Sequence, residues 1–260
     1  MPSITTYRGR RAALLLGCAL ISPALFPEGT QAFRNERALI ERIDRAMSPE
    51  SYTSTMAMEN RTGPDKATVT ENVAYRSGPR MLVLVRKPSI QRGQALLRDG
   101  DDMWLYLPAS RKLSRVGSKE KSFGSEASNA DLIRTNFSAD YDIVGFSTAD
   151  EAGSPLLRIE LKARRKSVAY DRVLYWIDEG AERPQKREYY ALSGKLLETM
   201  TFSDFAERDG RIVPTTIRIV NELNPSRQTT IHILSMDSKT PVPENRFNAA
   251  WLESGATTEE

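Results

Sequence analysis

The sequence predicts a mainly β (α+β) fold, a meandering antiparallel sheet or barrel of ten or eleven strands with two helical pieces. Strand-like alternation of apolar and polar residues recurs from residue 68 to residue 236. Turn sequences rich in Gly, Asp and Asn separate these segments at short intervals. A helical period over residues 35–47 precedes them. Since no linker, low-complexity tract or fixed-period repeat interrupts the chain, one continuous sheet is the simplest arrangement.

The N-terminal segment predicts export. Three arginines between positions 8 and 11 precede 15 uncharged residues, 12–26, which is a typical length for the apolar core of a signal peptide. This run is shorter than the ~20 apolar residues that span a membrane. Residues 30–32 (TQA) form a cleavage site with small side chains. We therefore expect residues 1–32 to be a signal peptide and the mature chain to begin at Phe33, with an uncleaved anchor as the alternative.

Cys18 bears on the localisation. It follows Leu15, Leu16 and Gly17, which resembles the lipid-attachment sequence of bacterial lipoproteins. A lipid-modified cysteine should end the apolar core, however, and here the apolar sequence continues to Phe26. A protein free in the periplasm is therefore favoured over one that is anchored by lipid at Cys18.

The composition of the mature chain excludes some classes of function. Removing the first 32 of the 260 residues leaves 228, and the three arginines and one glutamate lost with them lower the net charge from +3 to +1. A nearly neutral chain argues against nucleic acid as a partner. No cysteine remains for disulfides or thiol chemistry. The length fits one β-rich domain over residues 33–254, followed by a frayed tail at 255–260.

The predicted elements follow from periodicity and turns. Leu39, Ile40, Ile43 and Met47 form a narrow apolar stripe, so the helix at 35–47 should lie on the sheet. A helical turn is expected at 128–135 and a docking arm at 241–252. The expected strands cover residues 68–75, 81–85, 95–97, 103–107, 141–146, 156–163, 172–178, 186–192, 196–202, 212–220 and 229–236, with a further short strand at 112–116.

The chain offers few groups for catalysis or metal binding. Its one histidine, His232, lies on a predicted strand, on the face opposite Ile231 and Ile233. With no cysteine in the mature chain, a zinc site would need at least three carboxylates. The acidic run at 99–102 lacks the distal glutamate of an EF-type calcium loop and is expected to be a hairpin tip. We therefore predict no catalytic residues, no metal and no cofactor.

Two weaker signals remain open. No Gly-rich phosphate loop and no Gly-x-Ser-x-Gly elbow is present, and no pair of carboxylates stands out as that of a hydrolase. The basic cluster at 162–166 is either a solvated turn or a contact for anionic lipid headgroups or an acidic partner.

Several strands are apolar on both faces, although a half-exposed strand should alternate. In residues 103–107, Met103, Leu105 and Leu107 share one face while Trp104 and Tyr106 share the other, and residues 81–85 and 173–177 behave similarly. Both faces of such strands must be shielded from water. One face can pack against the helix at 35–47, and the other against an opposing wall or a cavity filled by an apolar ligand. A plain two-layer core is the alternative.

The motif at 101–108 (DDMWLYLP), followed by Arg111-Lys112, Ser122-Phe123-Gly124-Ser125 and Asp131-Leu132, resembles the signature of the outer-membrane lipoprotein-sorting (LolA-like) family. The resemblance extends over nearly all of the mature chain, and its motifs are short and structural. It implies an incomplete antiparallel β-barrel of about eleven strands with helices covering an apolar concave face. The chain is longer than the better-known carriers. The buried arginine that holds the lid of lipoprotein chaperones shut is not identifiable here, which favours a generic lipid-like cargo.

On that resemblance we expect the ligand-facing wall to comprise Leu82, Leu84, Trp104, Tyr106, Leu174 and Trp176. A slip of one residue in the register would instead bring Met103, Leu105, Val173 and Ile177 to that wall.

The function implied is that of a non-enzymatic periplasmic carrier. It would bind a lipid or acylated protein cargo in an apolar cavity and transfer it between envelope components, as a monomer, with an inner-membrane transporter as a further partner. The alternative is an envelope sensor or protein-interaction module associated with a membrane transporter. An enzyme is the third and least favoured class.

Overall fold

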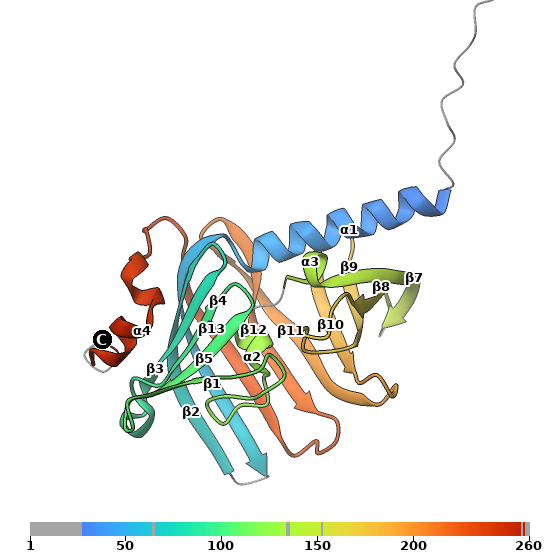
Figure 1. Cartoon of the computed structure of the whole chain (residues 1–260). Helices are drawn as coiled ribbons and strands as arrows, with labels where there is room; N and C mark the ends of the chain where they lie inside the picture. The colour runs from blue at the N-terminus through green and yellow to red at the C-terminus, as the bar shows by residue number, and fades with distance from the viewer. Residues whose placement is uncertain (1–27, 64–65, 134–135, 152, 256, 258–260) are drawn as a thin grey trace, which may run out of the picture.

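The computed structural model describes residues 28–63, 66–133, 136–151, 153–255 and 257. Within them it contains one 13-stranded antiparallel sheet in the order β6-β5-β4-β3-β2-β1-β13-β12-β11-β10-β9-β8-β7 (Figure 1). The strands are β1 (Ser51–Gly63), β2 (Lys66–Ser77), β3 (Arg80–Lys87), β4 (Ala95–Asp99), β5 (Asp102–Leu107), β6 (Lys112–Arg115), β7 (Tyr141–Glu151), β8 (Ser154–Ala163), β9 (Arg172–Asp178), β10 (Arg183–Tyr190), β11 (Leu196–Arg208), β12 (Arg211–Asn221) and β13 (Gln228–Asp237).

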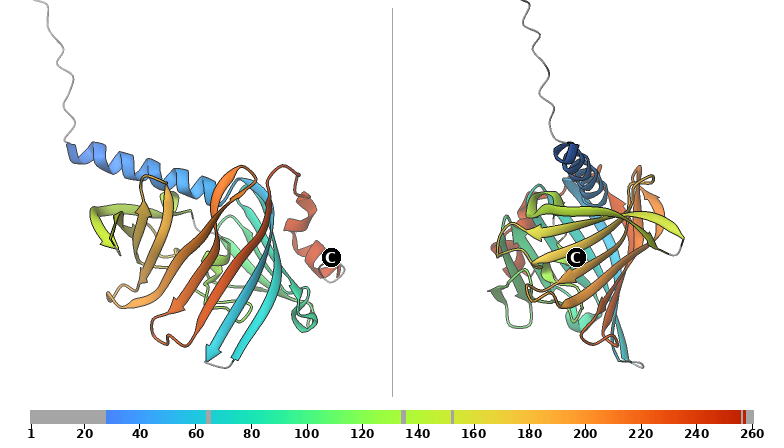
Figure 2. Two further views of the ribbon diagram at one scale, coloured as in Figure 1. Left: turned by 180° about the vertical axis from the view of Figure 1, so that it is seen from behind. Right: turned by 90° about the vertical axis from the view of Figure 1, so that its right-hand side faces the viewer.

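The sheet consists of two meanders that meet at its centre. Strands β1–β6 form one meander and β7–β13 the other, and the pairing of β1 with β13 joins them. The sheet curves strongly but stays open, with β6 and β7 as its edges (Figure 2). The predicted fold class, an incomplete antiparallel barrel with helices, is therefore confirmed, and β1 is the one strand among the described residues that no expected segment covers.

Strand β1 was not predicted from the alternation of apolar and polar residues in the sequence. Every second residue of β1 is buried, from Tyr52 to Asn60. Two of these buried positions hold the polar residues Ser54 and Asn60, so the apolar alternation is broken in the sequence. Asn60 is satisfied by accepting a hydrogen bond from the Thr229 hydroxyl at 2.7 Å. A buried polar side chain with a partner on a distant strand gives no local signal.

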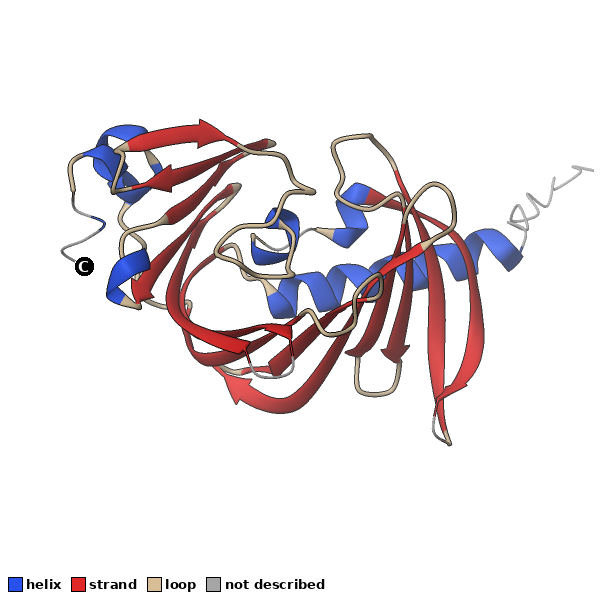
Figure 3. Ribbon diagram, turned by 90° about the horizontal axis from the view of Figure 1, so that it is seen from below, coloured by secondary structure: helices blue, strands red, loops and turns tan. Residues whose placement is uncertain are grey.

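The helices lie on both sides of the sheet. They are α1 (Glu28–Met47), η1 (Ser89–Gln91), α2 (Asn129–Leu132), α3 (Phe137–Asp140), η2 (Glu244–Phe247) and α4 (Ala249–Glu253). Helices α1, α2 and α3 lie on the side toward which the sheet curves, whereas η2 and α4 lie outside it, near β3 and β4 (Figure 3). Among the described residues, no helix combines the length and apolarity that crossing a membrane requires.

Helix α1 begins earlier than predicted. It starts at Glu28, so the expected first residue of the mature chain, Phe33, falls inside it. Residues 1–27 of the expected signal peptide lie outside the described residues. The predicted apolar stripe of Leu39, Ile40, Ile43 and Met47 is buried against the sheet, as its spacing requires.

The C-terminal arm packs on the outer face of β3, β4 and β5, two of which, β3 and β5, are apolar on both faces. In β3, Met81, Val83 and Val85 belong to the main core on the concave side. The alternate residues Leu82 and Leu84 lie on the outer face and are packed by η2 and α4. The predicted docking turn is thus confirmed. Of the tail at 255–260, Thr257 is buried, and residues 256 and 258–260 lie outside the described part.

Candidate functional site

An apolar pocket lies between the C-terminal end of α1 and the concave face of β11–β13. It encloses about 530 Å³, including the part open to solvent. Its floor consists of side chains that alternate inward along three neighbouring strands. In register, Met200 of β11 stands opposite Ile219 of β12, Phe202 opposite Ile217, and Ile217 opposite Ile231 of β13. The floor is therefore a continuous apolar patch three strands wide.

Helices α1 and α3 cover this pocket. Met47 and Asp44 of α1 and Phe137 of α3 line it from above. The two helices are held together through Ser138, whose backbone N–H donates to the Asp44 carboxylate at 2.9 Å. The Ser138 carbonyl accepts a hydrogen bond from Arg37 of α1 at 2.7 Å. The cover is thus a unit of two helices joined by a few polar contacts.

A buried arginine stands at the side of the pocket. Arg187 of β10 is 6% exposed, and its Nη2 donates to the Tyr175 hydroxyl at 2.7 Å. Its guanidinium carbon lies 4.0, 4.3 and 4.8 Å from the ring centroids of Phe137, Tyr175 and Phe202. Its Nε has no hydrogen-bond partner among the described residues. Burying a cation without an ion pair is costly, and the three rings offset only part of that cost.

Two carboxylates share the lining of the pocket. Burial raises the pKa of Asp44 to about 6, although the hydrogen bond from Ser138 and the charge of Arg187 oppose the shift. Burial also raises the pKa of Asp131, which accepts hydrogen bonds from the Ser128 hydroxyl at 2.6 Å and the Tyr170 hydroxyl at 2.8 Å. Both carboxyl groups are therefore shifted toward their neutral form.

The raised pKa of Asp44 predicts a pH-dependent stability. An unfolded aspartate titrates near pH ~3.9, so the folded protein binds the proton more readily between pH ~4 and 6. The contribution of Asp44 to stability is therefore full below that range and is lost as the pH rises through about 6. Asp44→Asn should exceed the wild type in free energy of unfolding at pH 7.5, and this gap should narrow by about 1 kcal/mol at pH 5. Urea denaturation at both pH values measures the gap.

The matched control for that measurement is Glu207→Gln, because Glu207 is an exposed carboxylate on β11. Its difference from the wild type should stay the same at both pH values. An equally constant gap for Asp44→Asn would show that Asp44 does not titrate in this range.

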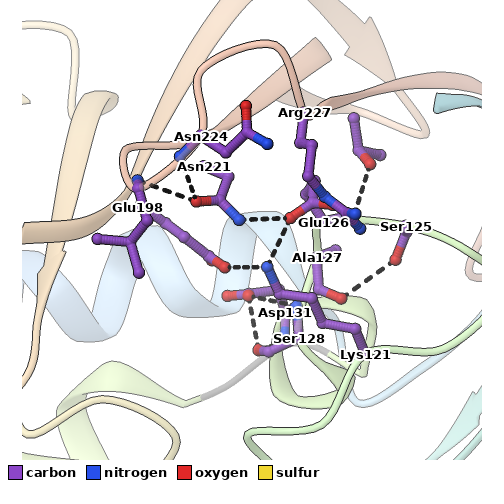
Figure 4. A network of polar contacts seen from close by, with 12 residues as sticks. Lys121, Ser125, Glu126, Ala127, Ser128, Asp131, Glu198, Asn221, Asn224 and Arg227 are labelled. Carbon is purple, nitrogen blue, oxygen red and sulfur yellow. Dashed lines mark hydrogen bonds and ion pairs between the residues drawn. The ribbon is translucent and has the colours of Figure 1, made fainter. Parts of the chain in front are cut away.

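A second polar cluster holds the segment between β6 and α2 in place. The Glu126 carboxylate, almost fully buried, accepts hydrogen bonds from Lys121 at 2.8 Å, Asn221 at 2.8 Å and Arg227 at 2.7 Å. Lys121 also pairs with Glu198 of β11 at 2.6 Å (Figure 4). We call these five residues the Glu126 network. It ties the segment to β11, to the end of β12 and to the β12–β13 turn.

The motifs at residues 122–125 and 131–132, which resemble the family signature, have a structural role in this segment. The Ser122 hydroxyl donates to the Asn129 side chain at 2.7 Å, and the Ser125 hydroxyl donates to the Ser122 carbonyl at 2.9 Å. Ser128 and Asp131 form a reciprocal capping box at the start of α2. These side chains satisfy the backbone of an irregular segment that lies against the sheet, and none of the contacts requires a ligand.

The six residues predicted to face a ligand lie in two outer clusters. Four of them, Leu82, Leu84, Trp104 and Tyr106, pack with Val242, Phe247 and Leu252 of the C-terminal arm. The other two, Leu174 and Trp176, pack with Leu156. The structure brings none of the six to the pocket beneath α1. Whether any of them contacts a ligand stays a prediction.

The alternative register has a different outcome. Met103, Val173 and Ile177 belong to the main core on the concave side, and Leu105 packs against it.

The residues that line the pocket beneath α1 were not predicted from the sequence. Arg187 gave one usable signal, because alternation in β10 puts it on the same face as the apolar Tyr189.

The other motifs of the sequence lie away from the pocket. His232 is exposed, with its Nδ1 3.3 Å from the Thr216 hydroxyl. The acidic run at 99–102 forms the turn between β4 and β5. In the basic cluster, Arg164 pairs with Asp142, and Arg165 with Asp140. Within the part of the chain that the structure describes, no three His, Cys, Asp or Glu side chains converge as metal ligands would.

Comparison with known proteins places these features in a family context. A family model with the description "Uncharacterized protein" matches residues 78–254 of this chain. No curated protein matches the sequence. A crystal structure of a LolA superfamily protein from Nitrosomonas europaea is 25% identical, with a TM-score of 0.73, and the match covers 82% of this chain and 96% of that one.

Two further solved structures are similar. An outer membrane lipoprotein-sorting protein domain from Vibrio parahaemolyticus is 22% identical, with a TM-score of 0.72, and covers 84% of this chain and 97% of its own. A DUF1329 family protein from Desulfovibrio piger is 20% identical, with a TM-score of 0.74, and covers 85% of this chain and 98% of its own. At these identities the two structures show a shared fold.

Proposed function

We propose that this chain, which belongs to the family whose model matches residues 78–254 and resembles the LolA superfamily in fold, is a non-enzymatic periplasmic carrier that holds a lipid or acylated cargo in the pocket beneath α1. It takes the cargo from one component of the envelope and releases it to another, acting as a monomer with an inner-membrane transporter as a partner.

The observation that carries this proposal is the apolar floor of the pocket. Five side chains from β11, β12 and β13 present a continuous apolar patch beneath the helical cover, in a hollow that is partly open to solvent. Burial of each methylene group contributes about 0.8 kcal/mol, so roughly ten methylenes supply binding energy without a covalent step.

The contacts around the pocket suggest which part opens. The Glu126 carboxylate at the centre of the Glu126 network is buried and accepts three hydrogen bonds, so the segment between β6 and α2 is firmly anchored. Helices α1 and α3, in contrast, are joined through Ser138 and cover a pocket containing the incompletely bonded Arg187. We therefore propose that α1 and α3 form the lid. Opening the lid exposes the apolar stripe of α1, so release requires a partner that binds the open form better.

Native mass spectrometry tests this function. The wild-type protein, purified from the periplasm of a Gram-negative host, should carry acyl material. Ile217→Asp, which places a charge on the floor, should reduce that material about tenfold or more. Ile217→Phe fills the same space without a charge and should reduce it as well. Circular dichroism then verifies that both variants are folded.

Trp104→Asp is the paired variant, because Trp104 belongs to the wall expected from the sequence and lies outside the pocket. If lipid is bound beneath α1, folded Trp104→Asp keeps its acyl material. Loss of lipid from Trp104→Asp together with retention by both Ile217 variants would move the site to the outer face. A wild-type protein that is empty but co-purifies with a membrane protein would favour the sensor or interaction module.

A further inference from the structure

Arg187 has more hydrogen-bond donors than the described residues satisfy. A guanidinium group has five N–H donors. Of these, Nη2 donates to the neutral hydroxyl of Tyr175 at 2.7 Å, and the buried Nε has no partner within the described part of the chain. No carboxylate there forms an ion pair with it. The charge is therefore held beside the pocket by aromatic rings, with donors left over.

The two carboxylates of the lining are engaged elsewhere. Asp44 accepts from the backbone of Ser138, and Asp131 accepts from Ser128 and Tyr170. Burial raises the pKa of both acids, while the charge of Arg187 opposes the shift in each. Neither carboxylate forms a hydrogen bond or an ion pair with Arg187 among the described residues, so the guanidinium group has no carboxylate partner there.

The register of the sheet joins this cation to the apolar floor. Arg187 of β10 stands opposite Met200 of β11, which stands opposite Ile219 of β12. The distance from β10 to β13 is about 14 Å, since neighbouring strands are about 4.8 Å apart. The pocket thus has a polar end at Arg187 and an apolar track that leads away from it. One cation at one end of one apolar track matches a ligand with a single polar end and an apolar chain.

We propose that the ligand is a single-chain lipid with an anionic terminal group, and that Arg187 binds this group while the chain lies over Met200, Ile219 and Ile217. This assignment rests on the proposed carrier function and names its class of cargo. A carboxylate and a phosphate share the required chemistry, because both accept paired hydrogen bonds from a guanidinium group.

Binding to lipid-stripped wild-type protein tests the selectivity. Hexadecanoate, hexadecyl phosphate and hexadecanol share one chain length and differ in the terminal group. Titration calorimetry below the concentrations at which micelles form should give affinities for one or both anions at least tenfold above that for hexadecanol, as expected for hydrogen bonds to a charged group. A preference for hexadecanoate identifies a fatty acid as the cargo, and a preference for hexadecyl phosphate identifies a phospholipid-derived chain.

Two variants assign the selectivity to Arg187. Arg187→Met keeps the length of the side chain and should remove the preference for anions while leaving hexadecanol affinity within about twofold. Arg187→Lys keeps the charge and should retain part of the preference. Lys195→Met removes an exposed positive charge from the β10–β11 turn and should change nothing.

Each contrary result has a distinct meaning. Equal affinities for all three lipids in the wild type would overturn the anionic cargo and leave the carrier function standing. No binding of any of the three would overturn both. If folded Arg187→Met keeps the preference, Arg187 is not the binding residue. If that variant does not fold, the wild-type comparison and Arg187→Lys still decide the question.

Discussion

Phe247→Ala is expected to lower the free energy of unfolding by about 3 kcal/mol, because it removes the central side chain of the C-terminal arm. Phe247 is 5% exposed and packs with Leu82, Leu84 and the other residues of the outer cluster. Arg80 lies over its ring, with the guanidinium carbon 5.4 Å from the centroid, and pairs with Glu244 in the same turn. The loss of the ring therefore removes both the apolar packing of Phe247 and its contact with the Arg80 guanidinium.

Urea denaturation followed by tryptophan fluorescence measures this loss, since Trp104 and Trp251 pack against the same cluster. Ile90→Ala is the control, because Ile90 is 88% exposed and its truncation should change stability by less than about 0.5 kcal/mol. A loss below about 1 kcal/mol for Phe247→Ala would show that the arm is not docked in solution.

The same variant separates the two locations for a ligand. If the outer residues Leu82, Leu84, Trp104 and Tyr106 hold lipid, loosening the arm that covers them should change the lipid content of the protein. If lipid is held beneath α1, the variant should lose stability and keep its lipid.

Glu126→Ala is expected to lower the free energy of unfolding by about 3 kcal/mol, because it removes a buried carboxylate that accepts three hydrogen bonds and leaves Arg227 without this ion pair. Lys121, Asn221 and Arg227 all donate to this carboxylate. The side chains of Lys121 and Arg227 are 31% and 44% exposed, so water compensates part of the loss and keeps the effect near the lower end of the usual range. For a protein of this size we expect the midpoint of thermal unfolding to fall by about 6–12 °C.

The pH dependence of the free energy of unfolding tests the contribution of Glu126 independently. Burial would raise the pKa of Glu126, but the hydrogen bonds from Lys121, Asn221 and Arg227 outweigh it and hold the pKa below its usual value. The contribution of Glu126 is therefore present above the unfolded pKa of ~4.3 and is lost as the pH falls through the lowered folded value. Glu126→Gln should be less stable than the wild type at pH 7, and the gap should close as the pH falls below about 4.

Glu207→Ala provides the matched control, since it removes an exposed glutamate of β11. A change in stability as small as that of the control would show that the segment between β6 and α2 does not depend on the Glu126 network. The segment could then move, and the distinction between an anchored side and an opening side of the pocket would be lost.

The main elements follow from the sequence because they depend on neighbours along the chain. Alternation and turn residues predict the strands, and helical spacing predicts the buried stripe of α1 from Leu39 to Met47. The apolar composition of both faces in residues 81–85, 103–107 and 173–177 predicts that these strands are covered on two sides, as β3 and β5 are, whereas the outer side chains of β9 pack only with neighbouring strands of the sheet. The C-terminal arm was predicted as a docking segment, but its place on the outer face was not.

The tertiary structure alone decided which face of each strand lines the pocket. Alternation separates Leu82 and Leu84 from Val83, but it does not say which set faces inward when both are apolar. That choice depends on the curvature of the sheet and on the C-terminal arm, which is distant in the chain. The burial of Arg187 likewise depends on Tyr175, Phe137 and Phe202, which come from three other elements. A strand arginine is normally exposed, and only these long-range contacts make it the polar end of an apolar pocket.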